Sequence, residues 1–421
     1  MTAATGQARI SAQPREQQPR AWLPVAAALL GIGWGANQIT PMLLVYRQTL
    51  GLGTGTLEAV FGVYALGLIP GLLIAGPLSD ARGRRAVVIP AAALSLLASV
   101  LLTGATLSVA LLFAGRLLAG VSSGAAFGAG TAWLRETSVP PLGTASDHSA
   151  ARRAAVAMTS GFALGPLVAG LLAQWAPSPT VLPYVPHLAV MAVVWVLLRR
   201  APETVETGRS RGWVPRLSVP ALRTRRFRSV VAPMAPWVFA APAIAFALLP
   251  SVAGAGQATN GIALTAAIAT LCALAGILIQ PLARRLDLRP GRNRAAAAGL
   301  LVLAAGLVLG AITAQRREVW LLVPSAIVLG CAYGMCLVAG LVEVQRLAAR
   351  GGAAGLIAIY YALTYLGFAA PYLIVLASHL ASYAVLLTVA AALALGTAAL
   401  ITRSPAGQPV TERDNRSQPA G

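Results

Sequence analysis

Long apolar stretches alternate with short arginine-rich turns along most of this chain. Each stretch has roughly 20 apolar residues, the length that a helix needs to cross the hydrocarbon core of a bilayer. The stretches begin near twelve positions: Trp22, Thr56, Ala86, Ser108, Ala154, Thr180, Ser229, Gly261, Ala295, Val319, Ala353 and Ala381. The pattern predicts an all-α membrane protein with twelve transmembrane helices.

The predicted spans fall into two groups of six, separated by a basic stretch with three prolines. We interpret this stretch as a cytoplasmic linker, because prolines interrupt any continuous span. The expected organisation is a cytoplasmic tail (1–21), a six-helix bundle (22–198), the linker (199–228), a second six-helix bundle (229–402) and a second cytoplasmic tail (403–421). The sequences at the ends of spans two and eight, and within spans five and eleven, are similar at nearly equal offsets, as expected for two parallel repeats.

The arginines predict which way the chain crosses the membrane. Cytoplasmic loops of membrane proteins carry an excess of basic residues. If both tails are cytoplasmic, 28 arginines lie in the tails and inner loops, and only Arg47, Arg316 and Arg317 lie outside. We therefore expect a multi-pass protein of the cell membrane, plasma or inner, with both termini in the cytoplasm.

Composition supports the membrane class and excludes several chemistries. The chain is 57% hydrophobic and 10% charged, with a mean hydropathy of +0.74. It contains no lysine, which excludes a Walker-type ATPase loop and a Schiff-base enzyme. The net charge of +20 is explained by inner-loop arginines, so no nucleic-acid partner is expected. The three cysteines lack metal-ligand spacing, and we expect neither a metal site nor a cofactor.

The turn from Gly76 to Arg85 reads GPLSDARGRR and lies between two predicted spans. It resembles the loop signature G-x-L-x-D-R-x-G-R-R/K of the major facilitator superfamily of secondary transporters, although Ala81 replaces one arginine. The resemblance implies a twelve-helix, alternating-access transporter whose cytoplasmic turn forms a charge latch that steadies the outward-facing state. The residues assigned to this latch are Gly76, Asp80, Gly83, Arg84, Arg85, Arg135 and Glu136.

Spans four and five carry two more motifs similar to those of this family. Span four has Arg116 where the family has an arginine that is linked to proton coupling, but Ala119 replaces the usual glutamine. Span five reads GFALGPLVAG and is similar to the motif of the drug and proton antiporter branch, which favours an exporter. Small residues also allow close helix packing, which is an alternative explanation of this second motif. Its residues are Gly161, Gly165, Pro166 and Gly170.

Several polar and aromatic side chains are candidates for a central substrate cavity. Asn37 and Gln38 lie about 12 Å deep in the first span, level with Arg116, at 1.5 Å per residue. Span ten and span eleven add aromatic side chains with hydroxyl groups, which suit lipophilic ligands. The alternative is that some of these residues only pack or lie at the bilayer interface. The cavity candidates are Trp34, Asn37, Gln38, Tyr333, Tyr361, Thr364 and Tyr365.

Glu58 is the carboxylate that lies inside the spans of the first half, about 5 Å below the outer surface at 1.5 Å per residue. If Glu58 approached Arg116 in one state and His379 in another, its proton affinity would change during transport. We therefore assign proton coupling to Glu58 and Arg116. The alternatives are an interfacial glutamate that contacts only water and headgroups, and an arginine that extends to the outer headgroups.

The sequence thus predicts a proton-coupled exporter of lipophilic small molecules or drugs. It would act as a monomer in a lipid bilayer, with protons and a small-molecule substrate as its partners. The first alternative is an importer or facilitator of a sugar-like or other polar metabolite, which the scarcity of acids and amides in the spans disfavours. The second is a membrane-embedded enzyme, which would need clustered aspartates or a His/Asp pair that the sequence lacks.

Overall fold

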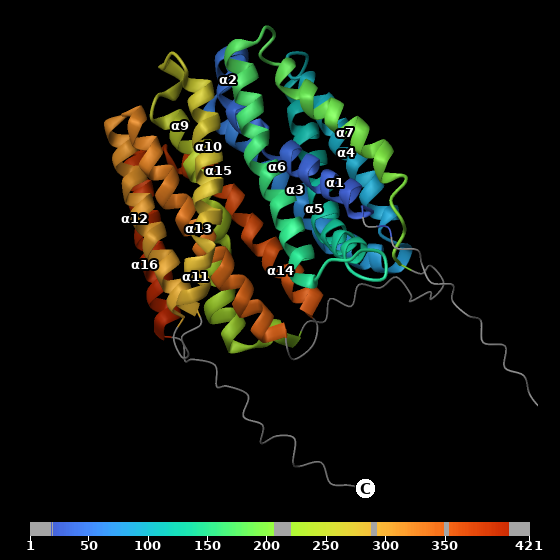
Figure 1. The fold of residues 1–421 in the computed structure, drawn as a ribbon. Helices are drawn as coiled ribbons and strands as arrows, with labels where there is room; N and C mark the ends of the chain where they lie inside the picture. Colours follow the sequence, from blue (N-terminus) through green and yellow to red (C-terminus); the bar gives the residue numbers. More distant parts are fainter. Residues whose placement is uncertain (1–17, 19, 206–219, 288–292, 349–352, 404–421) are drawn as a thin grey trace, which may run out of the picture.

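A computed structural model describes residue 18 and residues 20–205, 220–287, 293–348 and 353–403. These residues form helices and connecting turns, with no strand among them. The N-terminal helices, blue to green, gather on one side of the molecule, and the yellow to red helices gather on the other (Figure 1). Residues 206–219 of the predicted linker and most of both predicted tails lie outside the described residues.

The helices of the N-terminal half supply six apolar segments, the first of which is broken at Gln38. Their bounds are α1 Trp22–Asn37, α2 Ile39–Leu50, α3 Thr54–Arg82, α4 Arg85–Thr103, α5 Val109–Ser138, α6 Asp147–Trp175 and α7 Val185–Leu198. A 3₁₀ turn over Leu182–Tyr184 precedes α7, so the sixth segment runs over Leu182–Leu198 and is shorter than the other five. Ser108 and Ser146 accept backbone N–H groups at the starts of α5 and α6, as capping residues do.

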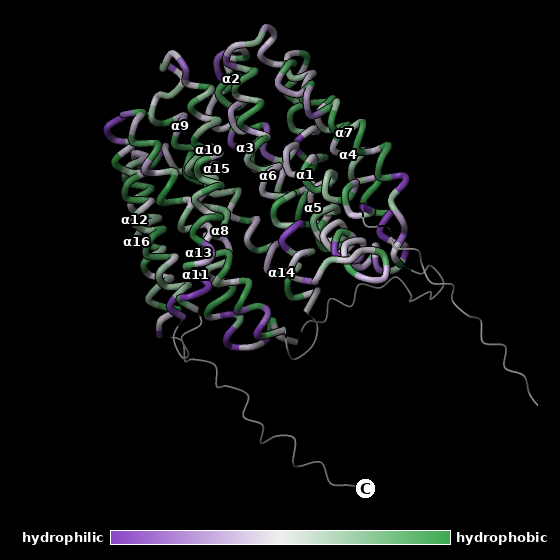
Figure 2. Tube along the Cα trace, viewed as in Figure 1, coloured by the Kyte–Doolittle hydropathy of each residue, from purple (hydrophilic) through white to green (hydrophobic). Residues whose placement is uncertain are grey.

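The C-terminal half has six further apolar segments, several of them divided into shorter helices. The first of these, the seventh of the chain, is continuous over Phe227–Val252 and contains two π-helical turns, Phe227–Val231 and Ile244–Leu248. The bounds are α8 Ala232–Ala243, α9 Leu249–Val252, α10 Gly261–Leu278, α11 Gln280–Asp287, α12 Arg294–Arg316, α13 Leu322–Ala348, α14 Ala353–Tyr365, α15 Ala370–Ala377 and α16 Tyr383–Arg403. The apolar residues cover the middle of the bundle, and polar residues lie mostly at its two ends (Figure 2).

The predicted all-α membrane fold is confirmed. Eleven described helical segments are at least 18 residues long and apolar enough to span a bilayer, and Leu182–Leu198 is the shorter twelfth. Residues 199–205, the first part of the predicted linker, pack on the N-terminal half. The indole Nε1 of Trp133 donates to the carbonyl of Pro202 at 2.9 Å, and Ala201 is buried.

Small residues bring α3 and α5 unusually close together. A Cβ atom added at Gly120 would lie 2.1 Å from the carbonyl oxygen of Tyr64, and one added at Gly124 would lie 2.2 Å from that of Leu68. Such distances are far below van der Waals contact, so only glycine fits there. Within a bilayer, where burial of apolar surface gives little drive for association, this close packing is a main source of helix–helix stability.

Candidate functional site

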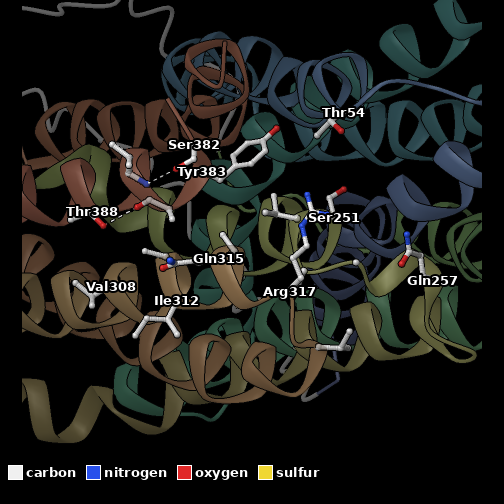
Figure 3. A pocket seen from close by; sticks show the side chains of 18 of the residues that line it. Thr54, Ser251, Gln257, Val308, Ile312, Gln315, Arg317, Ser382, Tyr383 and Thr388 are labelled. Atoms are coloured by element: carbon white, nitrogen blue, oxygen red, sulfur yellow. Dashed lines mark hydrogen bonds between the residues drawn. The ribbon is translucent and has the colours of Figure 1, made fainter. Parts of the chain in front are cut away.

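A small cavity of about 50 Å³ lies between the two halves. It is lined by Asn37, Tyr64, Phe162, Phe239, Pro242, Phe246, Ala273, Tyr333, Tyr365 and Phe368. Seven of these ten side chains are aromatic, one is an amide, and none is charged. A separate cavity of about 1020 Å³ opens beside α9, α12 and α16, and none of the predicted site residues lines it (Figure 3).

Three rings of the C-terminal half form a stack on one side of the small cavity. The ring centroids of Phe239 and Tyr365 are 4.4 Å apart with planes at 18°, and those of Phe239 and Phe368 are 5.2 Å apart at 16°. Phe368 also packs on Phe61 of α3 at 5.2 Å, which joins the two halves. The stack gives a flat, apolar surface of the kind that holds aromatic or lipophilic molecules.

The structure brings three of the seven predicted cavity residues to this cavity: Asn37, Tyr333 and Tyr365. The others are placed elsewhere. Gln38 donates to the hydroxyl of Ser99 at 2.8 Å, and the hydroxyl of Thr364 donates within its own helix to the carbonyl of Tyr361 at 2.7 Å. Trp34 is buried and, like Tyr361, is not among the lining residues.

Sequence reasoning missed five aromatic lining residues: Tyr64, Phe162, Phe239, Phe246 and Phe368. It favoured residues with polar groups, and phenylalanines in an apolar span carry no sign of which way they face. Tyr64 had a usable signal, because it lies on the span that carries Glu58 and its hydroxyl is a polar group near mid-membrane.

Arg116 is buried between α1, α3 and α5. Its side chain is only 1% exposed, and it donates to the carbonyl of Ala36 at 2.9 Å and to that of Phe61 at 3.3 Å. The guanidinium also lies 4.5 Å from the ring centroid of Tyr64, which is a cation–π contact. These partners offset the cost of a buried charge, and they exclude an extended, headgroup-bound Arg116 in this conformation.

Glu58 is buried as well, at 1% exposure, and its Oε2 atom has no hydrogen-bond partner among the described residues. The expected ion pairs are not present in this conformation: neither Arg116 nor the exposed His379 forms one with Glu58. Phe61 and Tyr64, which contact the guanidinium of Arg116, lie three and six residues after Glu58 on α3. At 1.5 Å per residue they are about 5–9 Å further along the helix. The burial of Glu58 does not fit the alternative of an interfacial glutamate that contacts only water and headgroups.

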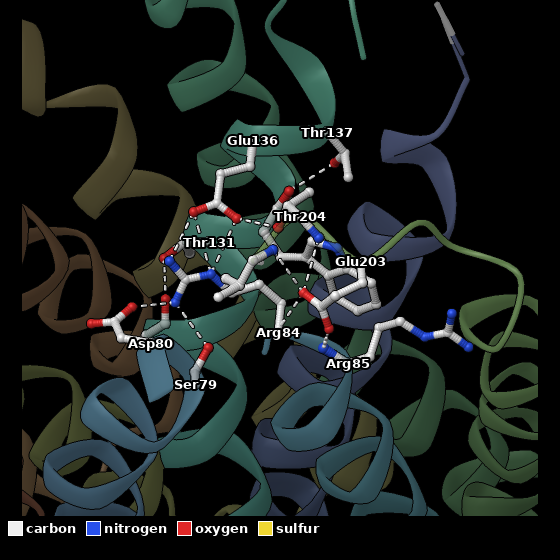
Figure 4. A network of polar contacts seen from close by, with 12 residues as sticks. Ser79, Asp80, Arg84, Arg85, Thr131, Glu136, Thr137, Glu203 and Thr204 are labelled. Carbon is white, nitrogen blue, oxygen red and sulfur yellow. Dashed lines mark hydrogen bonds and ion pairs between the residues drawn. The ribbon is translucent and has the colours of Figure 1, made fainter. Parts of the chain in front are cut away.

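Arg84 organises a polar cluster at the other end of the N-terminal half (Figure 4). Its guanidinium donates to Asp80 at 2.5 Å, to the hydroxyl of Ser79 at 2.9 Å and to Glu136 at 2.8 and 3.1 Å. Glu136 also accepts the hydroxyl of Thr204. Burial alone would lower the pKa of Arg84, but the hydrogen bonds and charges of Glu136 and Asp80 raise it above its ordinary value. Arg84 is therefore charged at every physiological pH.

Glu203 fixes the start of α4 from the segment that follows α7. Its carboxylate accepts the backbone N–H groups of Arg84 at 2.9 Å and Arg85 at 3.0 Å, as well as those of Thr204 and Val205. Gly83 has φ +99°, and a Cβ atom there would lie 2.6 Å from Glu203 Oε2. Partial burial raises the pKa of Glu203, but the four backbone hydrogen bonds outweigh it and leave the pKa below the ordinary value. An ionised carboxylate is also favoured at a helix N-terminus.

Two of the predicted latch residues are placed apart from this cluster. Arg135 pairs with Asp147 at 2.8 Å, and both side chains are more than 60% exposed. The side chain of Arg85 donates to the carbonyl of Arg199 at 2.7 Å, so only its backbone N–H joins the cluster. Sequence reasoning also missed Glu203 and Thr204, because they lie far along the chain in a stretch assigned to the linker.

The sequence matches the family model of the Major Facilitator Superfamily over residues 23–371. The chain belongs to this superfamily. It is a membrane transporter, as the superfamily and the transporters among its structural neighbours indicate.

One relative of this superfamily member matches a short segment of the chain. A segment of 81 residues, 19% of the chain, is 42% identical to multidrug resistance protein MdtL of Escherichia coli O45:K1 (strain S88 / ExPEC). The matched segment spans about a fifth of the length of that relative.

Solved structures of other transporters share the fold. A POT family transporter in complex with 5-aminolevulinic acid superposes with a TM-score of 0.73 at 12% identity, over 92% of this chain and 98% of that one. The nucleoside transporter NupG gives a TM-score of 0.71 at 13% identity, over 91% and 99%. A bacterial homolog of the human lysosomal transporter Spinster, inward-facing and unoccupied, gives 0.63 at 13% identity, over 90% and 93%. At these identities the likeness shows the fold alone.

The span-five motif of this superfamily member is a close-packing surface. Added Cβ atoms would lie 2.1 Å from the carbonyl oxygen of Leu30 at Gly161 and 2.5 Å from that of Trp34 at Gly165. A Cβ atom at Gly170 would lie 2.3 Å from the side chain of Ala266 on α10, in the opposite half. Pro166 lies inside α6.

The hydrogen bonds found between the two halves of this transporter lie away from Arg84. Arg47 donates to the hydroxyl of Ser251 at 3.2 Å, and Gln48 donates to the carbonyl of Gly256 at 2.9 Å. Gln174 binds the turn before α10 through Thr259 and the start of α10 through the N–H groups of Ile262 and Ala263. By contrast, a Cβ atom added at Gly76, beside the Arg84 cluster, would meet no described atom of another helix within 4 Å.

A buried hydrogen-bond chain links α1, α4 and α7 of this transporter. The hydroxyl of Ser99 accepts from Gln38 and lies 2.8 Å from His187 Nδ1, and His187 Nε2 lies 3.0 Å from the carbonyl oxygen of Gly31. The structure thus gives His187 partners on two other helices.

Proposed function

We propose that this chain exports lipophilic small molecules by alternating access, in exchange for protons. The observation that carries the proposal is the small cavity between the halves, with seven aromatic side chains, one amide and no charge. Such a lining can hold a flat, apolar molecule by stacking and orient it through a few hydrogen bonds. It offers little to a highly polar metabolite, whose lost hydration would have to be replaced by protein donors and acceptors.

We propose that the structure described above is in the inward-facing conformation. The arginine count assigns the Arg84 end to the cytoplasm, and most of the hydrogen bonds found between the halves are at the opposite end. One more, from the hydroxyl of Thr270 to the carbonyl of Ala163, lies within the spans. A closed outer end, together with the open space at Gly76, fits an inward-facing state. In the outward-facing state the turn from Gly76 to Arg85 would approach the C-terminal half. The Arg84 cluster, with Asp80 and Gly76, would then act as the latch.

Glu58 and Arg116 are the proposed coupling residues. Glu58 is buried beside the closed outer end, with one carboxylate oxygen unpartnered. Opening of that end would hydrate Glu58, and hydration favours loss of its proton. The charge of Arg116 lies near the cavity, because its guanidinium contacts the ring of Tyr64, one of the lining residues. A substrate that shifts Tyr64 would therefore also disturb the contacts of Arg116.

The partial similarity to a multidrug resistance protein and the span-five motif support export as the direction of transport. We further propose a monomer in the cell membrane with both termini cytoplasmic. The two bundles would span 22–198 and 229–402, joined by a cytoplasmic linker, 199–228, whose first residues, Arg199 to Val205, stay bound to the first bundle.

The test is transport into inverted membrane vesicles with an imposed pH gradient, inside acid. Fluorescent lipophilic dyes should accumulate, and an uncoupler should abolish the accumulation. Accumulation of sugars, nucleosides or peptides in right-side-out vesicles, with no dye transport in either orientation, would favour an importer of polar metabolites and overturn the proposal.

A further inference from the structure

The larger cavity, of about 1020 Å³, is cationic at its opening. Two arginines line it, Arg47 at the end of α2 and Arg317 just after α12, and its described lining includes no carboxylate. The nearby carboxylate of Glu318 accepts the indole N–H of Trp320 at 2.6 Å and is not part of the lining. The guanidinium of Arg317 has no hydrogen bond or ion pair with the described residues, and Arg47 binds only the hydroxyl of Ser251.

Uncharged polar groups surround the two arginines. Ser382, Tyr383 and Thr388 lie across the cavity from Gln315 and Arg317 (Figure 3). Arginine is well suited to phosphate because its planar guanidinium presents several N–H groups at once. The amides and hydroxyls beside it would supply further donors to phosphate or glycerol oxygens.

The deeper wall of the cavity is apolar. Val308 and Ile312 lie one turn apart on α12, and Val385 and Val389 lie one turn apart on α16. All four are between 43% and 52% exposed. Along α12 the lining thus changes within about three turns from two aliphatic side chains to Gln315 and then to Arg317. This order, apolar in the membrane and cationic at its surface, matches the order of groups in a phospholipid.

Two arginines in one cavity are unusual on the predicted outer face of the protein. Arg47, Arg316 and Arg317 are the three arginines that the sequence places outside the membrane, where basic residues are disfavoured. Two of these three come from opposite halves of the chain and meet in one cavity. Arg316 is the third and does not line it.

We propose that this cavity binds an anionic phospholipid of the outer leaflet, with its phosphate between Arg47 and Arg317 and an acyl chain along the aliphatic side chains of α12 and α16. A phospholipid fits better than a free anion, because a free anion would leave the apolar wall without a partner. The bound lipid would touch both halves, since Arg47 belongs to the N-terminal half and Arg317 to the C-terminal half. It would thereby stabilise the conformation in which the outer end is closed.

The test is native mass spectrometry of the full chain released from detergent, titrated with phosphatidylglycerol or phosphatidylcholine of equal chain length. We expect phosphatidylglycerol to remain bound preferentially. Arg317→Gln should weaken its binding by about fivefold, as expected for one basic residue near a membrane surface. Arg316→Gln, which removes the same charge one residue away, is the matched control and should leave binding unchanged.

Two further arms separate a lipid from a free anion. Val389→Asn, which leaves both arginines in place, should also weaken phosphatidylglycerol binding, and glycerol phosphate at equal concentration should not displace the lipid. Equal losses in the Arg316 and Arg317 variants, or equal binding of phosphatidylcholine, would overturn the proposal. Displacement by glycerol phosphate, with full binding in the Val389 variant, would assign the cavity to a soluble phosphate instead.

Discussion

Glu203 accepts the backbone N–H of Arg84 at 2.9 Å, and this contact ties the segment after α7 to the start of α4. The side chain of the same arginine binds Glu136 on α5 and Asp80 on α3. One residue thus joins three helices and the segment that leads to the second half. A change at Glu203 can therefore alter both the stability of the first half and the geometry of its charged turn.

Glu203→Gln should destabilise the protein by about 1–2 kcal/mol, the range found for loss of a helix cap. The pKa of Glu203 in the fold is below its ordinary value of 4.5. The stabilisation is therefore complete above that ordinary value and is lost as the pH falls through the lower, folded-state value. Thermal unfolding in detergent should show a constant gap between variant and wild type from pH 6 to 8 and a shrinking gap on acidification below about 4.5.

Asp147→Asn is the control for this measurement, because it removes a carboxylate from an exposed ion pair. Such pairs contribute roughly 0–1 kcal/mol. If the two variants unfolded at the same temperature, the role given to Glu203 would be wrong.

Asp80→Asn should impair transport far more than it lowers the amount of folded protein. In this conformation Asp80 is 66% exposed and pairs with Arg84, which also keeps its bonds to Glu136. Its removal therefore costs little stability here. The proposed latch would form in the other access state, so the loss should appear in the transport rate. The measurement is dye efflux normalised to expression, and wild-type rates would exclude the latch.

Arg116→Ala should abolish coupled transport, and Arg116→Lys should retain a fraction of it. Lysine keeps the charge but cannot bind the carbonyls of Ala36 and Phe61 at once with a planar fork. Dye accumulation driven by a pH gradient is the readout, with the folded fraction measured by gel filtration. Near-normal accumulation in the alanine variant would show that the Arg116 side chain only packs and that its charge is not needed for coupling.

Gly120→Ala should destabilise the N-terminal half by about 1–3 kcal/mol, the usual cost of overpacking. Its Cβ atom would lie 2.1 Å from the backbone oxygen of Tyr64. Gly128→Ala is a matched control two turns further along α5, where the new Cβ atom would meet only the end of Leu72 at 3.8 Å. Thermal unfolding in detergent should separate the two, and an equal effect would mean that α3 and α5 can move apart freely.

The fold could be predicted from the sequence because a bilayer restricts the choice. Apolar length sets each span, and arginine-rich turns set its ends. The cavity was harder to predict: Phe239 and Phe368 are indistinguishable in sequence from lipid-facing phenylalanines, and only tertiary packing turns them inward. Glu203 was missed for a related reason, since a carboxylate that caps a distant helix leaves no local pattern. Asn37 and Tyr365 were found because a polar group deep in a span needs a reason to be there.

The proposed exchange of protons for substrate is tested most directly in proteoliposomes that contain a pH-sensitive dye and the purified protein. Addition of a lipophilic substrate to one side should move protons in the opposite direction, in proportion to substrate flux. Glu58→Gln should keep substrate exchange between equal concentrations but lose both the proton movement and pH-driven accumulation. Proton movement that is absent from the wild type, or that persists in the Glu58 variant with full accumulation, would contradict the account.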